Sequence, residues 1–146
     1  MPKIEANIII NRSVEEIFTF LSVAENHARF IPGMTEVKQT SPGSFAQVGT
    51  TARGVRRDVV INTEVRYKIT QIEINKKLSM NGMMGPLRFD DGYVLEPMGS
   101  STRVNFWLEF NLTGPMLLAR PFIQFLGKTH ASETLANLKK VLETAK

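Results

Sequence analysis

Hydrophobic and polar residues alternate along the middle of the chain. In VVINTEVRYKIT, PLRFDDGYVLEP and RVNFWLEFNL every second residue is mainly apolar, and the residues between are mainly polar. A period of two places alternate side chains on opposite faces, so each segment is predicted to be a half-buried antiparallel strand. The predicted inward positions are Val59, Ile61, Thr63, Val65, Tyr67, Ile69, Leu87, Phe89, Asp91, Tyr93, Leu95, Val104, Phe106, Leu108, Phe110 and Leu112.

The N-terminal part combines strands with helical spacing. A strand is predicted at Ile4 to Ile10, followed by a helix in NRSVEEIFTFL, where Ser13 and Glu16 form a capping box. A second short helical piece, VAENHARFI, ends at the Pro-Gly pair of residues 32–33, and another strand follows at residues 34–38.

The C-terminal part is predicted to be one long amphipathic helix. At 100° per residue, one stripe contains Ile123, Leu126, Gly127, His130, Ala131, Thr134, Leu135, Leu138, Val141 and Leu142. Such a stripe needs a sheet to cover. Pro121 is tolerated if it lies at or near the first turn.

The order of elements predicts an α+β fold. One strand, two short helices, about six further strands and a long helix fit a curved antiparallel sheet of about seven strands wrapped around the C-terminal helix. The 146 residues, of which 42% are hydrophobic and 22% charged, are expected to form a single domain, 1–146.

Composition excludes several classes of site and partner. The absence of cysteine rules out disulfides and thiolate chemistry, and two histidines without cysteine form no recognisable metal cluster, so neither metal nor cofactor is expected. The net charge of +4 favours anionic partners only weakly. Arg53, Arg56 and Arg57 have no interleaved aromatic residues, so they indicate a solvated strand surface or an anion site rather than nucleic-acid binding. No signal peptide or membrane-spanning run is found, and a cytoplasmic location is expected.

Several segments carry a family resemblance: SVEEIFTFLSVAENHARFIPGMTEV, GTTARG, VRYKITQIEINKKLSM, GPLRFDDGYVLEP and TRVNFWLEFNLTGP. In these the chain resembles the START-like helix-grip superfamily, also called SRPBCC, and within it the small bacterial polyketide cyclase/dehydrase type. The resemblance implies a cavity between the long helix and the concave sheet, with the preceding loop at its mouth. It leaves the function open, because the superfamily includes lipid carriers, hormone receptors, ubiquinone-binding proteins and cyclases.

In such a fold GPMLLARPFIQFLGK forms a lid and the first turns of the long helix. Its apolar side chains are then expected to meet a ligand or the cavity wall rather than water. The alternative is that they fill a small core. The small size of Gly127 and Ala131 favours a cavity, because a packed core prefers larger groups on that stripe.

Two residues expected to point inward, His130 and Asp91, have chemistry of their own, and so does His27 of the second short helix. His130 is a structural histidine bonded to the sheet, a polar group of the pocket, or an acid/base catalyst. Asp91 lies near water at its strand end or is buried, in which case it needs a partner, either His130 or an inward Arg53. His27 is expected at the surface or in helix packing. The candidate ligand contacts are Thr63, Tyr67, Phe89, Asp91, Tyr93, Phe106, Leu108, Phe110, Phe122, Leu126, Gly127, His130 and Thr134.

Three functions stay open from the sequence. The first is binding of a hydrophobic or amphipathic small molecule, such as a lipid, isoprenoid quinone or polyketide-like compound, by a carrier, sensor or sequestering protein. The second is a cyclase or dehydratase with His130 as acid/base and Asp91 or Tyr67 beside it. The third is a membrane-surface or protein-interaction module that uses residues 116–125. Either a monomer or a homodimer is compatible with these functions.

Overall fold

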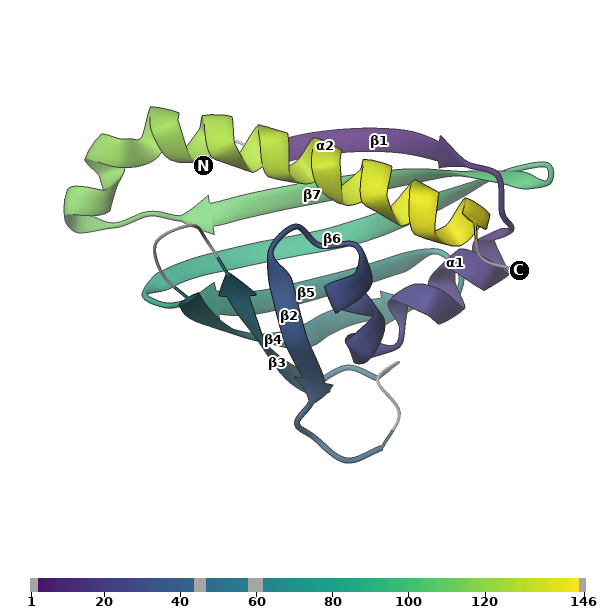
Figure 1. Ribbon diagram of the computed structural model, residues 1–146, viewed down its shortest axis with the longest axis horizontal. Coiled ribbons are helices and arrows are strands. Elements are labelled where there is room, and N and C mark those ends of the chain that lie inside the picture. Colours follow the sequence, from purple (N-terminus) through teal and green to yellow (C-terminus); the bar gives the residue numbers. More distant parts are fainter. Residues whose placement is uncertain (1–2, 44–46, 58–61, 145–146) are drawn as a thin grey trace.

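The computed structural model describes residues 3–43, 47–57 and 62–144. Within these residues seven strands form one antiparallel sheet in the order β1-β7-β6-β5-β4-β3-β2 (Figure 1). The strands are β1 (Ile4–Ile10), β2 (Met34–Gln39), β3 (Thr51–Arg57), β4 (Asn62–Glu73), β5 (Lys77–Met84), β6 (Leu87–Met98) and β7 (Ser101–Asn111). The predicted α+β fold is therefore confirmed. The predicted inward positions Val59 and Ile61 lie outside the described residues.

Helices lie in the three places where the sequence predicted them, and a further short helix occupies the segment expected to be a lid. They are α1 (Val14–Leu21) and η1 (Ala24–Arg29), between β1 and β2, and η2 (Gly114–Ala119) and α2 (Arg120–Thr144), after β7. The Ser13 hydroxyl accepts a 3.2 Å hydrogen bond from the Glu16 amide and so caps α1. Pro121 lies in the first turn of α2, where its missing amide hydrogen costs nothing.

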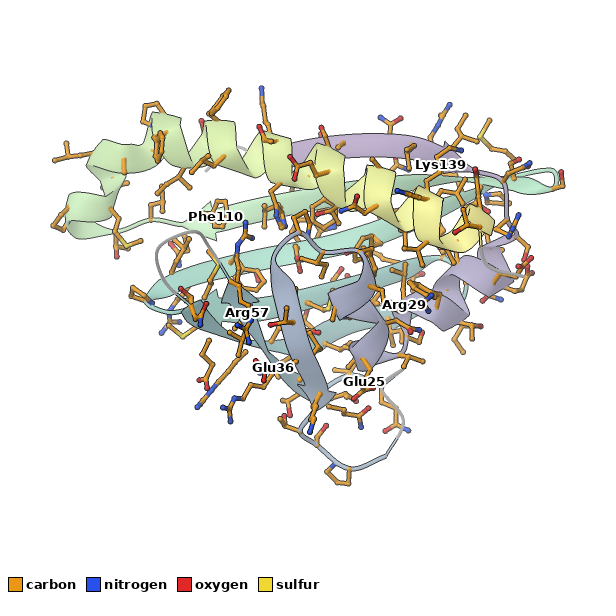
Figure 2. The ribbon with its side chains drawn as sticks, viewed as in Figure 1. Glu25, Arg29, Glu36, Arg57, Phe110 and Lys139 are labelled. Carbon is orange, nitrogen blue, oxygen red and sulfur yellow. The ribbon has the colours of Figure 1, made fainter. Side chains whose placement is uncertain are left out.

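Local irregularities add curvature to the sheet. The register between β4 and β5 shifts between Ile69 and Gln71, and that between β2 and β3 shifts between Thr35 and Lys38. Bulges of this kind increase the twist of a strand pair. At the shift between β2 and β3, Glu36 adopts a positive φ of 54°, and its carboxylate lies 3.4 Å from Arg57 of β3 (Figure 2).

Helix α2 lies against one face of the sheet, beside β1 and β7 (Figure 1). Its buried residues are Gly127, Ala131, Thr134, Leu135, Leu138 and Leu142, all from the predicted stripe. Near the C-terminal end of the helix, Lys139 Nζ donates to the Ile9 carbonyl of β1 at 2.7 Å (Figure 2). These contacts attach the helix to the edge strand.

Gly127 has a different role from the one expected. A Cβ atom added there would overlap Ile4 Cδ1 and lie 3.3 Å from Phe110. Figure 2 shows Phe110 beneath the first turns of α2. The expectation that this glycine leaves room for a guest was therefore incomplete, because Ile4 occupies the place of the missing side chain. The glycine allows close approach of α2 to β1.

Side chains fill the space under the second half of α2. Leu135 and Leu138 are fully buried there. Tyr93 lies in the same hydrophobic core, with its ring centroid 5.1 Å from that of Phe106 and 6.4 Å from that of Phe30. The first half of α2 lies over a different kind of interior, described next.

Candidate ligand-binding cavity

A cavity of about 490 Å³ lies between the first half of α2, the segment from η1 to β2, and the inner face of the sheet. This volume is within the range of small-molecule sites. Its lining is His27, Ile31, Pro32, Met34, Arg56, Val65, Tyr67, Met80, Met84, Leu87, Phe89, Asp91, Tyr93, Phe106, Leu108, Phe110, Ile123, Leu126, Gly127, Thr129, His130, Glu133 and Thr134. Most of these side chains are apolar, and the polar ones are His27, Arg56, Tyr67, Asp91, Tyr93, Thr129, His130, Glu133 and Thr134.

Strand register arranges the cavity wall in rows. Gly82 of β5 pairs with Tyr67 on one side and with Phe89 on the other. A Cβ atom at Gly82 would lie 2.6 Å from the Phe89 ring and 2.9 Å from Tyr67 Cβ. The glycine therefore provides space for two aromatic rings on neighbouring strands.

The next row contains the carboxyl group. Asp91 pairs with Met80 on one side and with Leu108 on the other. Both neighbours line the cavity, so Asp91 is placed in an apolar stretch of wall.

Most of the predicted ligand contacts line this cavity. They are Tyr67, Phe89, Asp91, Tyr93, Phe106, Leu108, Phe110, Leu126, Gly127, His130 and Thr134. Two predicted residues do not line it. Phe122 is 65% exposed, and Thr63 is the second residue of β4, beside the β5–β6 turn at Gly85. Contact of the lining residues with a ligand stays a prediction.

His27 is a cavity residue that sequence reasoning missed. It was expected at the surface or in helix packing, but only 1% of it is exposed, and it lines the cavity. Its Nε2 lies 2.8 Å from the Leu21 carbonyl oxygen and its Nδ1 lies 2.7 Å from the Tyr67 hydroxyl. Burial lowers the pKa of His27 to about 4, so the ring is neutral near pH 7. The signal in the sequence was the apolar residue three positions earlier, Ala24. Residues three apart lie on the same side of a 3₁₀ helix, so an inward Ala24 also turns His27 inward.

Asp91 lacks the partner that was expected for it. Its Oδ1 is buried and has no hydrogen-bond partner in the part of the chain that the structure describes. Burial, together with the nearby charge of Asp90, raises the pKa of the Asp91 carboxyl to about 7. Arg53, one of the two expected partners, is an exposed residue whose Nε lies 2.8 Å from Glu64. Arg53 therefore does not meet the condition, set by the sequence, that it point inward.

His130 is paired with Arg56 instead. Arg56 Nη1 donates to His130 Nδ1 at 3.2 Å, which forms the bond to a sheet residue that the sequence allowed. Burial, and then the charge of Arg56, lower the pKa of His130 to about 4. A neutral ring whose Nδ1 accepts carries its proton on Nε2, so His130 retains one donor.

The apolar lid residues face solvent, contrary to expectation. We define the lid patch as Leu117, Leu118, Phe122, Phe125 and Leu126, which are 48%, 89%, 65%, 67% and 49% exposed. Figure 1 shows that η2 and the first turns of α2 extend past the start of β1, so the edge strand does not cover them. Of this segment, Ile123, Leu126 and Gly127 reach the cavity lining.

The chemistry available in the cavity is that of organic recognition. Across the described ranges, no three histidine or acidic side chains come together as a metal-binding group. Nor does any helix in those ranges have the length and hydropathy needed to cross a membrane. The polar groups of the cavity include a hydroxyl at Tyr67, a carboxyl at Asp91 and an imidazole at His130, on a mainly apolar wall. The cavity fits a mainly apolar molecule with a few polar groups.

A long helix gripped by a curved sheet, with a cavity between them, defines a helix-grip protein. The chain belongs to the family described as polyketide cyclase/dehydrase and lipid transport, whose model matches residues 1–143. No curated protein matches the chain significantly in sequence.

Solved structures share this fold at low sequence identity. TTHA0849 from Thermus thermophilus is 18% identical with a TM-score of 0.80, and the match covers 99% of this chain and 100% of that one. The di-domain aromatase/cyclase BexL of the BE-7585A biosynthetic pathway is 16% identical with a TM-score of 0.81, over 98% of this chain and 47% of that one. The Zhui aromatase/cyclase from Streptomyces sp. R1128 is 8% identical with a TM-score of 0.77, over 97% of this chain and 93% of that one.

Proposed function

We propose that this protein binds a hydrophobic or amphipathic small molecule between α2 and the sheet, as a carrier, sensor or sequestering protein. The observation that carries the proposal is the cavity of about 490 Å³, whose mainly apolar wall contains a buried carboxyl oxygen without a partner in the described chain. An unsatisfied buried polar atom costs about 1–3 kcal/mol, which a guest's hydrogen-bond donor would recover. The family description, which includes lipid transport, supports the same function.

Affinity and orientation would come from different parts of the wall. Apolar burial contributes roughly 25 cal/mol per Å², before the cost of ordering the guest. Polar groups at Tyr67, Asp91 and His130 would fix the orientation of the guest. Lipids, isoprenoid quinones and polyketide-like compounds all combine an apolar body with such groups.

The test is native mass spectrometry of the freshly purified protein, followed by solvent extraction and identification of the released compound. A stoichiometric organic guest supports the binding function and names its chemical class. An apo protein that also fails to bind pyrene-type or fatty-acid probes by fluorescence titration contradicts it.

A cyclase or dehydratase activity on a polyketide-like substrate is the second candidate. The observation that favours it is Asp91, a cavity carboxyl whose pKa is raised to about 7 by burial and by Asp90. A general acid or base works best when its pKa is near the working pH. His130 would assist as the Nε2–H donor. The similar structures named aromatase/cyclase support this candidate at the level of fold.

We also propose transient contact of the lid patch with an anionic membrane surface. The patch is strongly exposed, and residues 110–132 contain Arg120 and Lys128 but no aspartate or glutamate. Apolar side chains next to basic ones fit a bilayer that carries anionic lipids. Because Leu126 belongs both to the patch and to the cavity lining, such contact would bring a membrane-derived guest to the cavity.

A further inference from the structure

Two hydrogen bonds of His27 fix the direction of the hydrogen bond to Tyr67. The Leu21 carbonyl is only an acceptor, so His27 Nε2, 2.8 Å away, carries a proton and donates it. A neutral imidazole has one N–H, so His27 Nδ1 is an acceptor. The Tyr67 hydroxyl, 2.7 Å from Nδ1, therefore donates its proton to His27.

The surroundings hold His27 in this state. Its ring stacks on Tyr67 with centroids 5.6 Å apart and meets the edge of Phe30 at 5.9 Å, so the orientation of the imidazole is fixed by packing. Burial keeps the ring neutral near pH 7, against the smaller opposing effects of the Leu21 hydrogen bond and Glu25. The arrangement is set by the chain itself and needs no guest.

Tyr67 is placed to meet a guest. It lies on the inner face of β4, lines the cavity and is itself buried. Burial, followed by the charge of Asp91, raises the pKa of Tyr67, so the phenol stays protonated. A phenol has a single proton, and His27 receives it, so towards a guest the Tyr67 oxygen acts only as an acceptor.

We propose that Tyr67 Oη recognises a hydroxyl group of the guest, so that the cavity binds a phenol, enol or alcohol in preference to an ether or ketone of the same shape. The proposal rests on the binding function proposed above and adds to it the class of polar group that the guest carries. His27 is a positioning residue in this scheme, because it acts by orienting the Tyr67 proton.

The test compares three rigid fluorescent probes that differ at one position: pyrene, 1-methoxypyrene and 1-hydroxypyrene. The wild-type chain is titrated with each at neutral pH. We expect 1-hydroxypyrene to bind about 10-fold more tightly than 1-methoxypyrene, the size of effect expected for one buried hydrogen bond. Tyr67→Phe should reduce this ratio to about 2-fold or less. Thr102→Val is the control: it removes a buried hydroxyl of the same sheet that lies outside the cavity lining, so it should keep the full ratio.

His27→Leu tests the positioning role separately. Without the imidazole acceptor, the Tyr67 proton becomes available to the guest, so Tyr67 can donate to the ether oxygen of 1-methoxypyrene. The ratio should then fall because the methoxy probe gains affinity. Pyrene affinity and a thermal melt of each variant show whether the cavity is intact, and if Tyr67→Phe does not fold, His27→Leu carries the test.

The outcomes distinguish this inference from the proposed function. Equal affinities of the hydroxy and methoxy probes for the wild-type chain, or a full ratio in Tyr67→Phe, would overturn hydroxyl recognition while pyrene binding still supports a ligand cavity. Failure of all three probes to bind the wild-type chain would overturn both proposals.

Discussion

Arg56 Nη1 donates to His130 Nδ1 at 3.2 Å and so joins β3 to α2 across the cavity. The bond uses one imidazole nitrogen as an acceptor and leaves the other as a donor. It also opposes protonation of His130, because a second positive charge beside Arg56 is unfavourable. A histidine held in this way serves recognition more readily than proton uptake.

His130→Gln separates recognition from catalysis. The glutamine carbonyl still accepts from Arg56, but the amide cannot exchange a proton. We expect guest affinity to change by about 3-fold or less, whereas an acid/base role of His130 requires turnover to fall about 100-fold or more. Affinity and product formation are measured on the same preparation, with Ser132→Ala on the exposed side of α2 as the control. Unchanged turnover would exclude His130 as the acid or base.

Asp91→Asn tests the buried carboxyl through the pH dependence of stability. The folded chain raises the pKa of Asp91 from 3.8 to about 7, so the native state binds this proton more tightly than the unfolded state. Its contribution to stability is fully present below pH 3.8 and is lost as the pH rises through 7. Relative to wild type, the free energy of unfolding of Asp91→Asn should therefore rise by roughly 2 to 3 kcal/mol between about pH 5 and pH 8.

Urea melts of both proteins at about pH 5, 6, 7 and 8 measure this difference. The lowered pKa values of His27 and His130 give the opposite slope, with stability lost as the pH falls from 6.5 towards 4. That contribution is common to both proteins, so it cancels in the comparison. A difference that does not change with pH would show that Asp91 is not desolvated in solution.

Gly127→Ala tests the close approach of α2 to β1. Alanine is favoured over glycine within a helix by about 1 kcal/mol. Here its Cβ atom would overlap Ile4 Cδ1, so we expect a net loss of about 1–3 kcal/mol in unfolding free energy. Ile4→Val removes the overlapping atom and should reduce the cost of the alanine in a double-mutant cycle. A Gly127→Ala variant that is more stable than wild type would contradict this contact.

Leu108→Trp tests the cavity by filling it. Leu108 lines the cavity, so the larger side chain has space to enter, and we expect guest binding to fall about 10-fold or more with less than about 1.5 kcal/mol lost in stability. Glu109→Trp is the matched control, because the adjacent residue of the same strand lies on the other face of the sheet and does not line the cavity. Fluorescence titration and chemical denaturation measure the two effects, and equal guest binding by both variants would argue against this site.

The lid patch is tested with Leu118→Glu combined with Phe122→Glu. We expect binding to vesicles that contain phosphatidylglycerol to fall about 10-fold, and binding by the wild-type chain to weaken as salt is added. Ile74→Glu is the control, since Ile74 is equally apolar and 79% exposed but lies in another part of the chain, at the β4–β5 turn. Vesicle sedimentation measures the effect. A wild-type dimer that the patch substitutions dissociate, with no vesicle binding, would instead assign the patch to a second copy.

Much of the fold was predictable because alternation and helical spacing are local patterns. The pattern placed Tyr67, Phe89 and Asp91 on one face of the sheet, and the structure brings them to one cavity wall. Ser13 likewise marked the start of α1. Each of these inferences needed only the neighbours of the residue along the chain.

The features that the sequence did not predict depend on contacts between elements that lie far apart along the chain. The sequence did not show which arginine of TARGVRR points inward, because three arginines interrupt the alternation. In the structure the buried Ala52 and Gly54 lie on the same face as Arg56, and Arg53 lies on the opposite face. His27 lies in a helix too short to show a period. Phe122 is exposed because the first turns of α2 extend past the start of β1, a relation between two elements that the pattern of a single helix does not show.

The pairing of β1 with β7 determines when the cavity forms during synthesis. Ile4 pairs with Leu108 and Ile10 with Thr102. Strand β1 is the first strand of this sheet to be synthesised, and its neighbour β7 is the last, so β1 is paired only after the other strands have been made. Helix α2, which closes the cavity, is made later still. Contacts so distant in sequence slow folding, and the nascent chain exposes an unpaired apolar strand in the meantime. The cavity is therefore complete only after translation of α2, and a chain truncated before β7 lacks the strand that carries Phe106, Leu108 and Phe110 of its wall.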